Sequence, residues 1–547
     1  MNRLWMTLLP LALGFVTGCN GVIDSRGSEQ TGTGGGPPTG NTPSASDVRQ
    51  RCPESKVAPP MLRRLTRREL ENTIRDAFPQ LGQAWAGVKL GPDPLSTLKF
   101  TNDSSALVVG PETAKEILRT AKDVAGLVTG SASLSTILPC AATAADQACA
   151  SQFIDNVGPK LYRRTLTDAE RSELLTYYAS VAGRSNFAMG LKWALISMLQ
   201  SPDVLYRSEI GDASGQLTPE EIATELAYTF GGTAPSTDLL GKASRGELGS
   251  ADALVREAQA LQQTDRGRET LRQFFREWAG YEKVLGTTKD AVTNFAQVQT
   301  SMVQETQRFI DEVVFASGGS VKDLLTAKYT FVDTTLAPFY GFGATTAGFT
   351  RADRPANWGM GLLAQGSILA GTSHPKQTSP VFRGLLVYAK LLCNVPPQPP
   401  NIVPNIDQAP PANTTRERYE NVHAQSSCAA CHHAFEPFGY ALEHFDESGR
   451  YRATENTYTI NAAGSAQLAD GANLAFDGLD DLATKLANLP GVTDCVSGLL
   501  ATYAFAGGGG RVCLAEEART ALANGTYGLR DFYTQLVNAP SFTRRAR

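Results

Sequence analysis

The chain of 547 residues has an ordinary globular composition, with 42% hydrophobic residues and a formal net charge of -4. It has no basic excess and no run of Lys and Arg, which argues against a nucleic-acid surface. Beyond the N-terminal segment, no apolar stretch reaches the length of a membrane span. We therefore expect more than one domain or one large helical assembly, with no nucleic acid among its partners.

The N-terminus has the features of a secretory signal. A short basic head precedes an apolar run from Leu4 to Val16, which is too short to span a membrane. Small residues and Cys19 close the run and resemble the lipobox of bacterial lipoproteins, in which the cysteine is lipidated. An ordinary signal peptide beside an unrelated cysteine is the alternative. We predict a signal peptide over 1–18, a lipid anchor at Cys19 and a flexible Gly/Ser/Thr/Pro-rich tether over 19–50.

The body of the chain has the capping and periodicity of helices. Thr66, Thr167 and Thr218 are each followed three residues later by Glu, the pattern of a capping box. Apolar residues recur at intervals of three and four after each of these positions. We expect further helices at about 190–206, 251–283, 299–316, 357–369 and 380–392. Weak alternation over 458–468 predicts a small hairpin, and the final 65 residues are again helical in pattern.

One short stretch indicates a specific chemistry. Cys428-Ala429-Ala430-Cys431-His432 has the Cys-x-x-Cys-His spacing of a c-type haem attachment site. Cys428 and Cys431 would each form a thioether to a haem vinyl group, and His432 would be the proximal iron ligand. We predict one covalently bound haem c at this position.

Three alternatives use the same stretch. A thioredoxin-type dithiol would need a strand-to-helix context, which the sequence lacks. A plain disulfide between the two cysteines is the second alternative. A structural zinc would need further ligands, for which His423, His433 and His444 lie near in sequence. Covalent haem is preferred because the chain carries an export signal, and c-type haem is attached to exported proteins.

The sixth iron ligand would decide what such a site does. A saturated iron moves electrons, whereas an open position binds or activates small oxygen species. His433 is a poor candidate because adjacent side chains on a helix diverge. Three residues are candidates, each otherwise an ordinary core or surface residue, and the first is slightly favoured: His374, Met360 and His444. Arg383 is a candidate partner for a haem propionate, with a plain helix-surface arginine as the alternative.

The remaining cysteines fit an oxidising compartment. Six are left once the lipid and haem positions are set aside, and an even remainder is typical of disulfides. Local spacing favours the pairs Cys140–Cys149 and Cys495–Cys513, which leaves Cys52–Cys393 by elimination. Sequence alone does not prove the pairing, and buried thiols are the alternative.

Several segments together resemble one known family. They include Arg-Arg-Leu-Thr-Arg-Arg-Glu-Leu at 63–70, Leu-Tyr-Arg-Arg-Thr-Leu-Thr-Asp-Ala-Glu at 161–170, Leu-Tyr-Arg-Ser-Glu-Ile-Gly at 205–211, Thr-Ser-Pro-Val-Phe-Arg-Gly at 378–384 and the stretch 428–446. They look like the exported, cytochrome-c-like proteins of planctomycetes and myxobacteria, which are built from consecutive domains of unknown function. The resemblance covers Met61 to the C-terminus. It implies a mainly α fold, one c-type haem and an envelope location, and no known substrate.

The predicted fold is mainly α, with a multi-helix body followed by a small cytochrome-c-like haem segment and a C-terminal helical module. After the signal and tether, we place an N-terminal helical module over 51–135, a helical module over 136–208, a central helical domain over 209–393, a Pro-rich strap over 394–413, the haem segment over 414–480 and the C-terminal module over 481–547.

The predicted function is electron transfer by an exported, lipid-anchored protein of the cell envelope, on its periplasmic or outer-membrane face, with a redox partner protein. The alternatives are a peroxidase-like haem oxidoreductase with an open iron site, and a lipid-anchored interaction scaffold in which haem is structural. The sequence shows no other catalytic motif.

Overall fold

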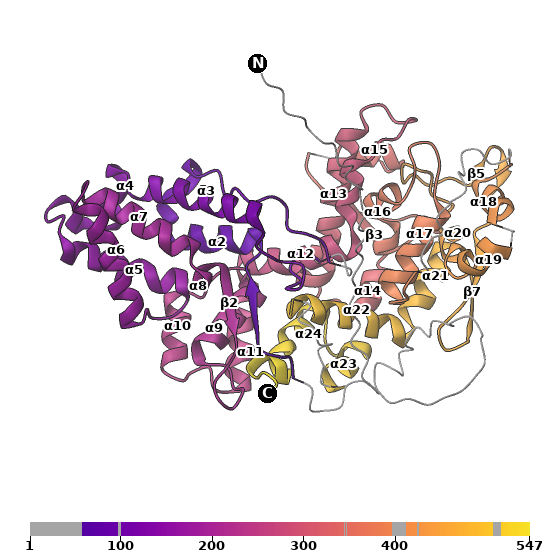
Figure 1. Cartoon of the computed structure of the whole chain (residues 1–547). Coiled ribbons are helices and arrows are strands. Elements are labelled where there is room, and N and C mark those ends of the chain that lie inside the picture. The colour runs from indigo at the N-terminus through magenta and orange to yellow at the C-terminus, as the bar shows by residue number, and fades with distance from the viewer. Residues whose placement is uncertain are drawn as a thin grey trace, which may run out of the picture. The chain divides into compact units, whose positions relative to one another are not determined.

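Helices make up most of the described chain, as the sequence predicts (Figure 1). The computed structural model describes residues 57–96, 100–343, 345, 347–396, 412–423, 426–506 and 516–547, all within one compact unit. Among these residues no helix combines the length and apolar character needed to cross a membrane. The predicted signal peptide, the tether, Cys19 and most of the Pro-rich strap lie outside the described residues.

The first group of helices shares one hydrophobic core. Strand β1 (Met61–Arg64) pairs antiparallel with β2 (Tyr206–Glu209) and so joins the two ends of the group. Fully buried Phe153, Leu191 and Met198 belong to this core. The elements between the strands are α2 (Arg67–Ala77), η1 (Pro79–Ala84), α3 (Pro111–Val128), α4 (Ser131–Ile137), η2 (Pro139–Ala142), α5 (Gln147–Tyr162), α6 (Asp168–Ala182), α7 (Phe187–Gln200) and α8 (Pro202–Leu205).

All three predicted capping boxes form. Thr66 precedes α2, Thr167 precedes α6 and Thr218 precedes α9 (Pro219–Gly231). Each Thr hydroxyl accepts a hydrogen bond from the backbone N–H of the Glu three residues on, and that Glu accepts one from the backbone N–H of the Thr. These helix starts follow from local sequence because each box satisfies two N–H groups that a helix N-terminus leaves open.

The central helices form a second core. They are α9, α10 (Thr237–Ser244), α11 (Ala251–Gln263), α12 (Asp265–Ala279), η3 (Tyr281–Gly286), α13 (Phe295–Asp311), η4 (Glu312–Ala316) and α14 (Val321–Thr326). The predicted helix over 251–283 is two helices, because the Thr264 hydroxyl accepts from the Gly267 N–H and so starts α12 anew.

The helix predicted over 357–369 is also shorter than expected. Only η5 (Leu362–Ala364) and α16 (Gly366–Gly371) are helical there. Gly361 has a φ of 65°, and a Cβ on it would lie 2.1 Å from the Leu325 carbonyl oxygen. The backbone therefore turns at this glycine, although the helical spacing of apolar residues continues through it. Before this segment, β3 (Tyr329–Val332) and β4 (Thr350–Asp353) pair antiparallel around α15 (Leu336–Tyr340).

The C-terminal helices complete the core of the central ones. They are α21 (Gly478–Ala487), α22 (Pro490–Ala504), α23 (Glu516–Ala523), α24 (Leu529–Gln535), η8 (Leu536–Asn538) and α25 (Pro540–Thr543). The Tyr533 hydroxyl donates to the Thr229 carbonyl at 2.6 Å, and the rings of Tyr533 and Phe230 lie 5.1 Å apart. The end of the chain is therefore packed against α9.

The segment with the Cys-x-x-Cys-His motif lies between these two groups of the second core in sequence. It follows α17 (Pro380–Leu386) and η6 (Val387–Leu391), and comprises α18 (Thr415–His423), α19 (Ser426–His432) and α20 (Glu436–Tyr440). Two small strand pairs follow: β5 (Thr454–Glu455) with β6 (Tyr458–Thr459), and β7 (Ala463–Gln467) with β8 (Asn473–Asp477). The predicted hairpin over 458–468 is therefore wrong, because its two strands, β6 and β7, pair with β5 and β8 and not with each other.

Two disulfides lie among the described residues. Cys140–Cys149 forms as predicted. The second joins Cys393 to Cys495, whose Cα atoms lie 5.5 Å apart, well within bonding range. The predicted pairs Cys495–Cys513 and Cys52–Cys393 are therefore wrong, since tertiary packing brings Cys393 and Cys495 together across 102 residues of sequence. Cys52 and Cys513 lie outside the described residues.

Candidate functional site

The Cys-x-x-Cys-His motif lies on the short helix α19. Cys428 and Cys431 are three residues apart on this helix, so their side chains point to the same side. Both are partly exposed and neither forms a disulfide. His432 ends the helix. The structure thus places two reduced thiols side by side next to an imidazole.

A buried carboxylate, Glu436, holds that imidazole. One of its oxygens, Oε1, lies 2.9 Å from His432 Nδ1 and 2.6 Å from His423 Nδ1. The other oxygen accepts from the Tyr440 hydroxyl at 3.0 Å. Burial by itself raises the pKa of Glu436, but the hydrogen bonds from His423 and His432 outweigh burial and hold that pKa below its ordinary value of 4.5.

The contact with Glu436 assigns the tautomer of both imidazoles. An ionised carboxylate only accepts hydrogen bonds, so each Nδ1 carries the proton that is donated to Oε1. A neutral ring protonated at Nδ1 has its lone pair on Nε2, which is the atom left to bind a metal. Metal-binding histidines usually have such a carboxylate or carbonyl behind them. His432 is therefore prepared to be a ligand, and so is His423.

Local sequence explains how α18 presents His423. The Thr414 hydroxyl accepts from the Glu417 N–H at 3.2 Å, and the Glu417 carboxylate accepts from the Asn413 N–H at 2.8 Å. Thr414 thus caps α18 with the same Thr-to-Glu spacing as the three capping boxes, but the Glu417 side chain reaches one residue further back. At the other end of α18, the His423 ring stacks on that of His432, with 3.6 Å between the ring centroids.

Close packing of α17 against α20 fixes the segment that follows the Cys-x-x-Cys-His helix to the helical body (Figure 1). A Cβ on Gly384 would lie 2.0 Å from the Phe435 carbonyl oxygen, and one on Gly439 would lie 2.0 Å from the Pro380 carbonyl oxygen. Only glycine allows both approaches. Two stretches singled out in the sequence, 378–384 and 436–446, therefore face each other.

Arg383 lies within this packing and is fully buried. Its guanidinium ion-pairs with Glu443 at 3.1 Å and donates to Ser373 Oγ at 3.1 Å. It also donates to three backbone carbonyls, those of Leu442, Phe445 and Asp446, each at 2.9 Å. These partners occupy both Nη atoms and give Arg383 a structural role, while its contact with a haem propionate stays a prediction.

The three candidates for a sixth ligand lie against other parts of the fold. The His374 ring packs on Phe382, and His374 lines a cavity of about 840 Å³ with Arg418 and Arg452. Thr415, at the first turn of α18, lines the same cavity, whereas His423 ends that helix about 12 Å further along at 1.5 Å per residue. His374 is thus placed beside the opposite end of α18 from His423 and His432.

The other two candidates have partners of their own. His444 Nδ1 donates to the Arg452 carbonyl at 3.0 Å, and its ring stacks on Tyr451. Met360 is buried beside Gly359, whose own surroundings are Leu479, Ala364 and Phe445. The sixth ligand stays a prediction.

Sequence reasoning did not single out two residues that face the motif. Glu436 lies four residues after His432, a spacing that would have suggested a contact. Tyr388, on η6, has its ring 6.1 Å from that of Phe435, which in turn lies 5.1 Å from the His432 ring. Burial raises the pKa of Tyr388, and the neighbouring Cys431 raises it further.

The same cluster also fits a bare metal ion. One ligand atom from each of His423, His432 and Glu436 lies within 4.8 Å of the others. Two imidazoles and a carboxylate are a known zinc ligand set. The zinc alternative thus uses His423, as the sequence allowed, but with His432 and Glu436 in place of His433 and His444.

Fold and site together define a mainly helical, multi-domain protein with a Cys-x-x-Cys-His helix backed by a buried carboxylate. Comparison with family models finds four consecutive regions of unknown function: DUF1587 (PSD3) over 63–130, DUF1595 (PSD5) over 149–209, DUF1592 (PSD4) over 217–342 and DUF1588 (PSCyt3) over 359–455. The chain is thus assembled from consecutive domains of unknown function, as the resemblance implied. Comparisons with curated proteins and with solved structures gave no significant match.

Proposed function

We propose that this protein is an exported, lipid-anchored c-type haem protein that transfers electrons in the cell envelope. The observation that supports this most is the arrangement around α19. Two reduced thiols lie on one side of the helix, and Glu436 Oε1, 2.9 Å from His432 Nδ1, leaves Nε2 of His432 for iron. The short name of the family model that contains this helix, PSCyt3, is consistent with a cytochrome-like domain.

The residues present fit the group. Cys428 and Cys431 would hold haem c by thioethers, and His432 would bind its iron; the bound haem supplies a one-electron carrier. Glu436 positions the imidazole and increases its basicity by accepting the Nδ1 proton. A more basic ligand with a buried negative charge behind it favours the oxidised iron, so we expect a low reduction potential.

The proposed location in the cell envelope is supported mainly by the N-terminal sequence. The apolar run that ends at Cys19 supports export and lipidation, and the disulfide Cys140–Cys149 fits an oxidising compartment. We propose a membrane-tethered protein that exchanges electrons with a redox partner protein.

A peroxidase-like oxidoreductase is the second candidate, and the contact between Glu436 and His432 favours it. An electron-rich axial ligand promotes cleavage of an O–O bond, as thiolate ligands do in other haem proteins. The described partners of His374, His444 and Met360 belong to other parts of the fold. An iron without a protein ligand on its second side would bind small oxygen species.

The experiment is expression in a host that exports proteins and attaches c-type haem, followed by haem staining after denaturing electrophoresis. The parent protein should stain, and the Cys428→Ala/Cys431→Ala variant should not.

The optical spectrum then distinguishes electron transfer from the enzyme function. A six-coordinate low-spin spectrum that added cyanide leaves unchanged supports electron transfer, and a spectrum that shifts with cyanide supports the enzyme. Covalent haem that exchanges no electrons with any redox dye would support the scaffold alternative. Parent protein without covalent haem refutes all three.

A variant at His423 distinguishes bound haem from a bare metal ion. His423→Ala should keep covalent haem, because the thioethers and His432 are untouched. It should remove a zinc ion, because one of three ligands is lost. Metal analysis of both proteins for iron and zinc gives the answer. Zinc in the parent, lost in His423→Ala, would overturn the haem proposal.

A further inference from the structure

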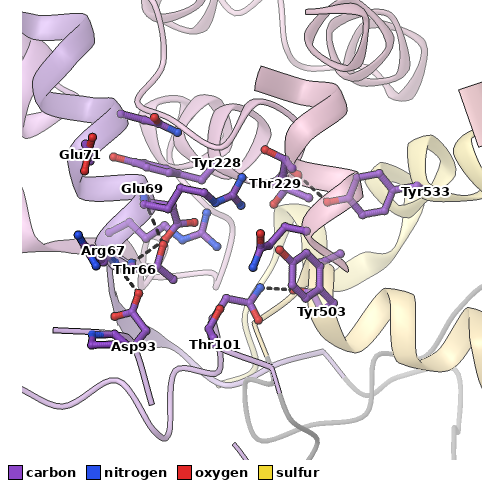
Figure 2. Close-up of a pocket in the computed structure, with 18 residues that line it drawn as sticks. Thr66, Arg67, Glu69, Glu71, Asp93, Thr101, Tyr228, Thr229, Tyr503 and Tyr533 are labelled. Carbon is purple, nitrogen blue, oxygen red and sulfur yellow. Dashed lines mark hydrogen bonds between the residues drawn. The ribbon is translucent and has the colours of Figure 1, made fainter. Parts of the chain in front are cut away.

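A second cavity, of about 400 Å³, lies where α2 meets α9, α12 and the C-terminal helices (Figure 2). The cavity is bordered by Tyr228 and Thr229 of α9, Tyr503 of α22 and Tyr533 of α24, and the Tyr533 hydroxyl donates to the Thr229 carbonyl at 2.6 Å. Its lining residues come from the regions matched as DUF1587, DUF1595 and DUF1592, and from the C-terminal helices outside every match. No part of it belongs to the candidate haem site.

The acidic residues of this cavity are already engaged. Glu69 accepts the Thr66 N–H in the capping box at 2.8 Å. Glu71 pairs with Arg75 at 2.8 Å. Asp93 pairs with Arg64 at 2.6 Å and also accepts the Arg67 N–H at 2.6 Å. Each of these carboxylates therefore has a hydrogen-bond or ion-pair partner of its own, and the Glu69 charge also acts on Arg207.

Two arginines of the cavity, in contrast, have groups without a hydrogen-bond partner. Arg68 is partly exposed and has no hydrogen-bond or ion-pair partner among the described residues. Its charge opposes the burial that raises the pKa of Tyr503 and Tyr533, which shows that it acts on both phenols. Arg207 is 4% exposed, and its Nη1 is buried without a hydrogen-bond partner.

Arg207 belongs to a buried cluster of charged side chains. The cluster holds three guanidiniums, those of Arg63, Arg207 and Arg545, and two carboxylates, those of Glu209 and Glu225. Arg63 pairs closely with Glu209 at 2.6 Å, whereas Arg207 lies 3.6 Å from Glu209 and 3.9 Å from Glu225. Glu69 supplies a third negative charge near Arg207, and these carboxylates together raise the pKa of Arg207 although burial lowers it. The Nη1 of Arg207 still lacks a hydrogen-bond acceptor, and a buried donor without a partner is costly, so an anion in the cavity that accepts from it would stabilise the cluster.

We propose that this cavity binds a small molecule through an oxyanion, a carboxylate or a phosphate, held between Arg68 and Arg207. Guanidiniums match both groups with paired N–H donors. The Tyr503 hydroxyl, for which the structure describes no hydrogen bond, is available to a polar group of the same ligand. Tyr228, Tyr503 and Tyr533 line the cavity and give the remainder of the ligand an aromatic surface.

The test is titration calorimetry of the full protein with three probes that share one ring: D-glucuronate, D-glucose 1-phosphate and uncharged D-glucose. We expect saturable binding of at least one charged probe and none of D-glucose. Binding of only one charged probe identifies the oxyanion. D-glucose binding as tightly as the charged probes, or no saturable binding of either charged probe, would overturn the proposal.

Variants tie the binding to this cavity. Arg68→Ala should weaken it at least tenfold, and Arg68→Lys should restore part of the loss, because lysine keeps the charge but not the paired donors. Arg184→Ala removes an equal charge from an exposed turn after α6 and should leave the affinity unchanged. Tyr503→Phe, which removes only the hydroxyl, is a second and milder variant. Equal affinity in the parent, Arg68→Ala and Tyr503→Phe would place the binding elsewhere and refute the assignment.

Discussion

Replacing Arg383 by methionine should strongly destabilise the packing of α17 against α20. The side chain is fully buried, and it donates hydrogen bonds to three carbonyls after α20, to Ser373 and to Glu443. Methionine fills a similar volume but leaves these acceptors and the Glu443 charge without the guanidinium. Removal of one partner of a buried ion pair costs about 3–5 kcal/mol, so we expect a loss of that size in the free energy of unfolding.

The loss should depend on pH through Glu443. Burial raises the pKa of Glu443 above its ordinary value of 4.5, whereas Arg383 and Arg452 lower it, so loss of Arg383 raises it further. A carboxyl with a raised pKa binds its proton more tightly in the folded than in the unfolded state. Its contribution to stability is present below the unfolded pKa and is lost as pH rises through the folded pKa. The deficit of Arg383→Met should therefore be smaller at about pH 4 than at about pH 7.

Urea unfolding followed by circular dichroism measures these differences. The Cys428→Ala/Cys431→Ala background, which cannot attach haem, removes any contribution from a propionate. In that background Arg383→Met should still lose stability, and adding Glu443→Gln should recover part of it at neutral pH. Exposed Arg184→Ala is the control and should stay within about 0.5 kcal/mol of the parent. If Arg383→Met matched the parent there and changed only the haem spectrum of the haem-bearing protein, our structural role for Arg383 would be refuted.

Three further predictions concern a close backbone approach, a disulfide and a buried lysine. Gly439→Ala should cost about 1–3 kcal/mol in urea unfolding, because its Cβ would meet the Pro380 carbonyl, whereas Gly491→Ala, with no atom within 4 Å, should cost little; equal effects would contradict the close approach. Replacing Cys393 and Cys495 together by alanine should lower the free energy of unfolding by about 3–5 kcal/mol, and reduction of the parent, which also opens Cys140–Cys149, should cost at least as much. Burial lowers the pKa of Lys289 to about 8, so the unfolded state binds more protons between about pH 8 and 10.5, and stability should rise with pH there relative to Lys289→Met; a parallel pH profile of the two proteins would speak against it.

Features that depend on neighbouring residues were predictable from the sequence. The Thr-to-Glu spacing at Thr66, Thr167 and Thr218 predicted three helix starts, because a capping box uses only residues three apart. The disulfide Cys140–Cys149 spans nine positions and was found for the same reason. The spacing of Cys428 and Cys431 likewise implies thiols on one side of a helix.

Features that depend on distant contacts were not predictable. Nothing near Cys393 or Cys495 indicates a pairing across 102 residues. Arg383 has the spacing of an exposed helix residue, and only its five partners explain its burial. The cluster of charged side chains around Arg207 also becomes visible only when strands β1 and β2 meet and the last residues of the chain bring in Arg545.

The glycine pair between α17 and α20 also had no signature. Gly384 and Gly439 are single glycines in helical sequence, and their need appears only once the two backbones touch. The contact of Glu436 with two imidazoles was predictable only in part. The spacing of Glu436 to His432 is local, but the second imidazole, His423, comes from another helix.

The bond between Cys393 and Cys495 closes a covalent ring around everything from α18 to the start of α22. A protease that cut the chain once inside this ring would leave the Cys-x-x-Cys-His helix attached to both the preceding body and the C-terminal helices. In an oxidising compartment, one nick between the two cysteines therefore leaves the segment with the Cys-x-x-Cys-His helix attached to the protein. Separation of the body from the C-terminal helices by a single cut inside the ring would also need reduction of this disulfide.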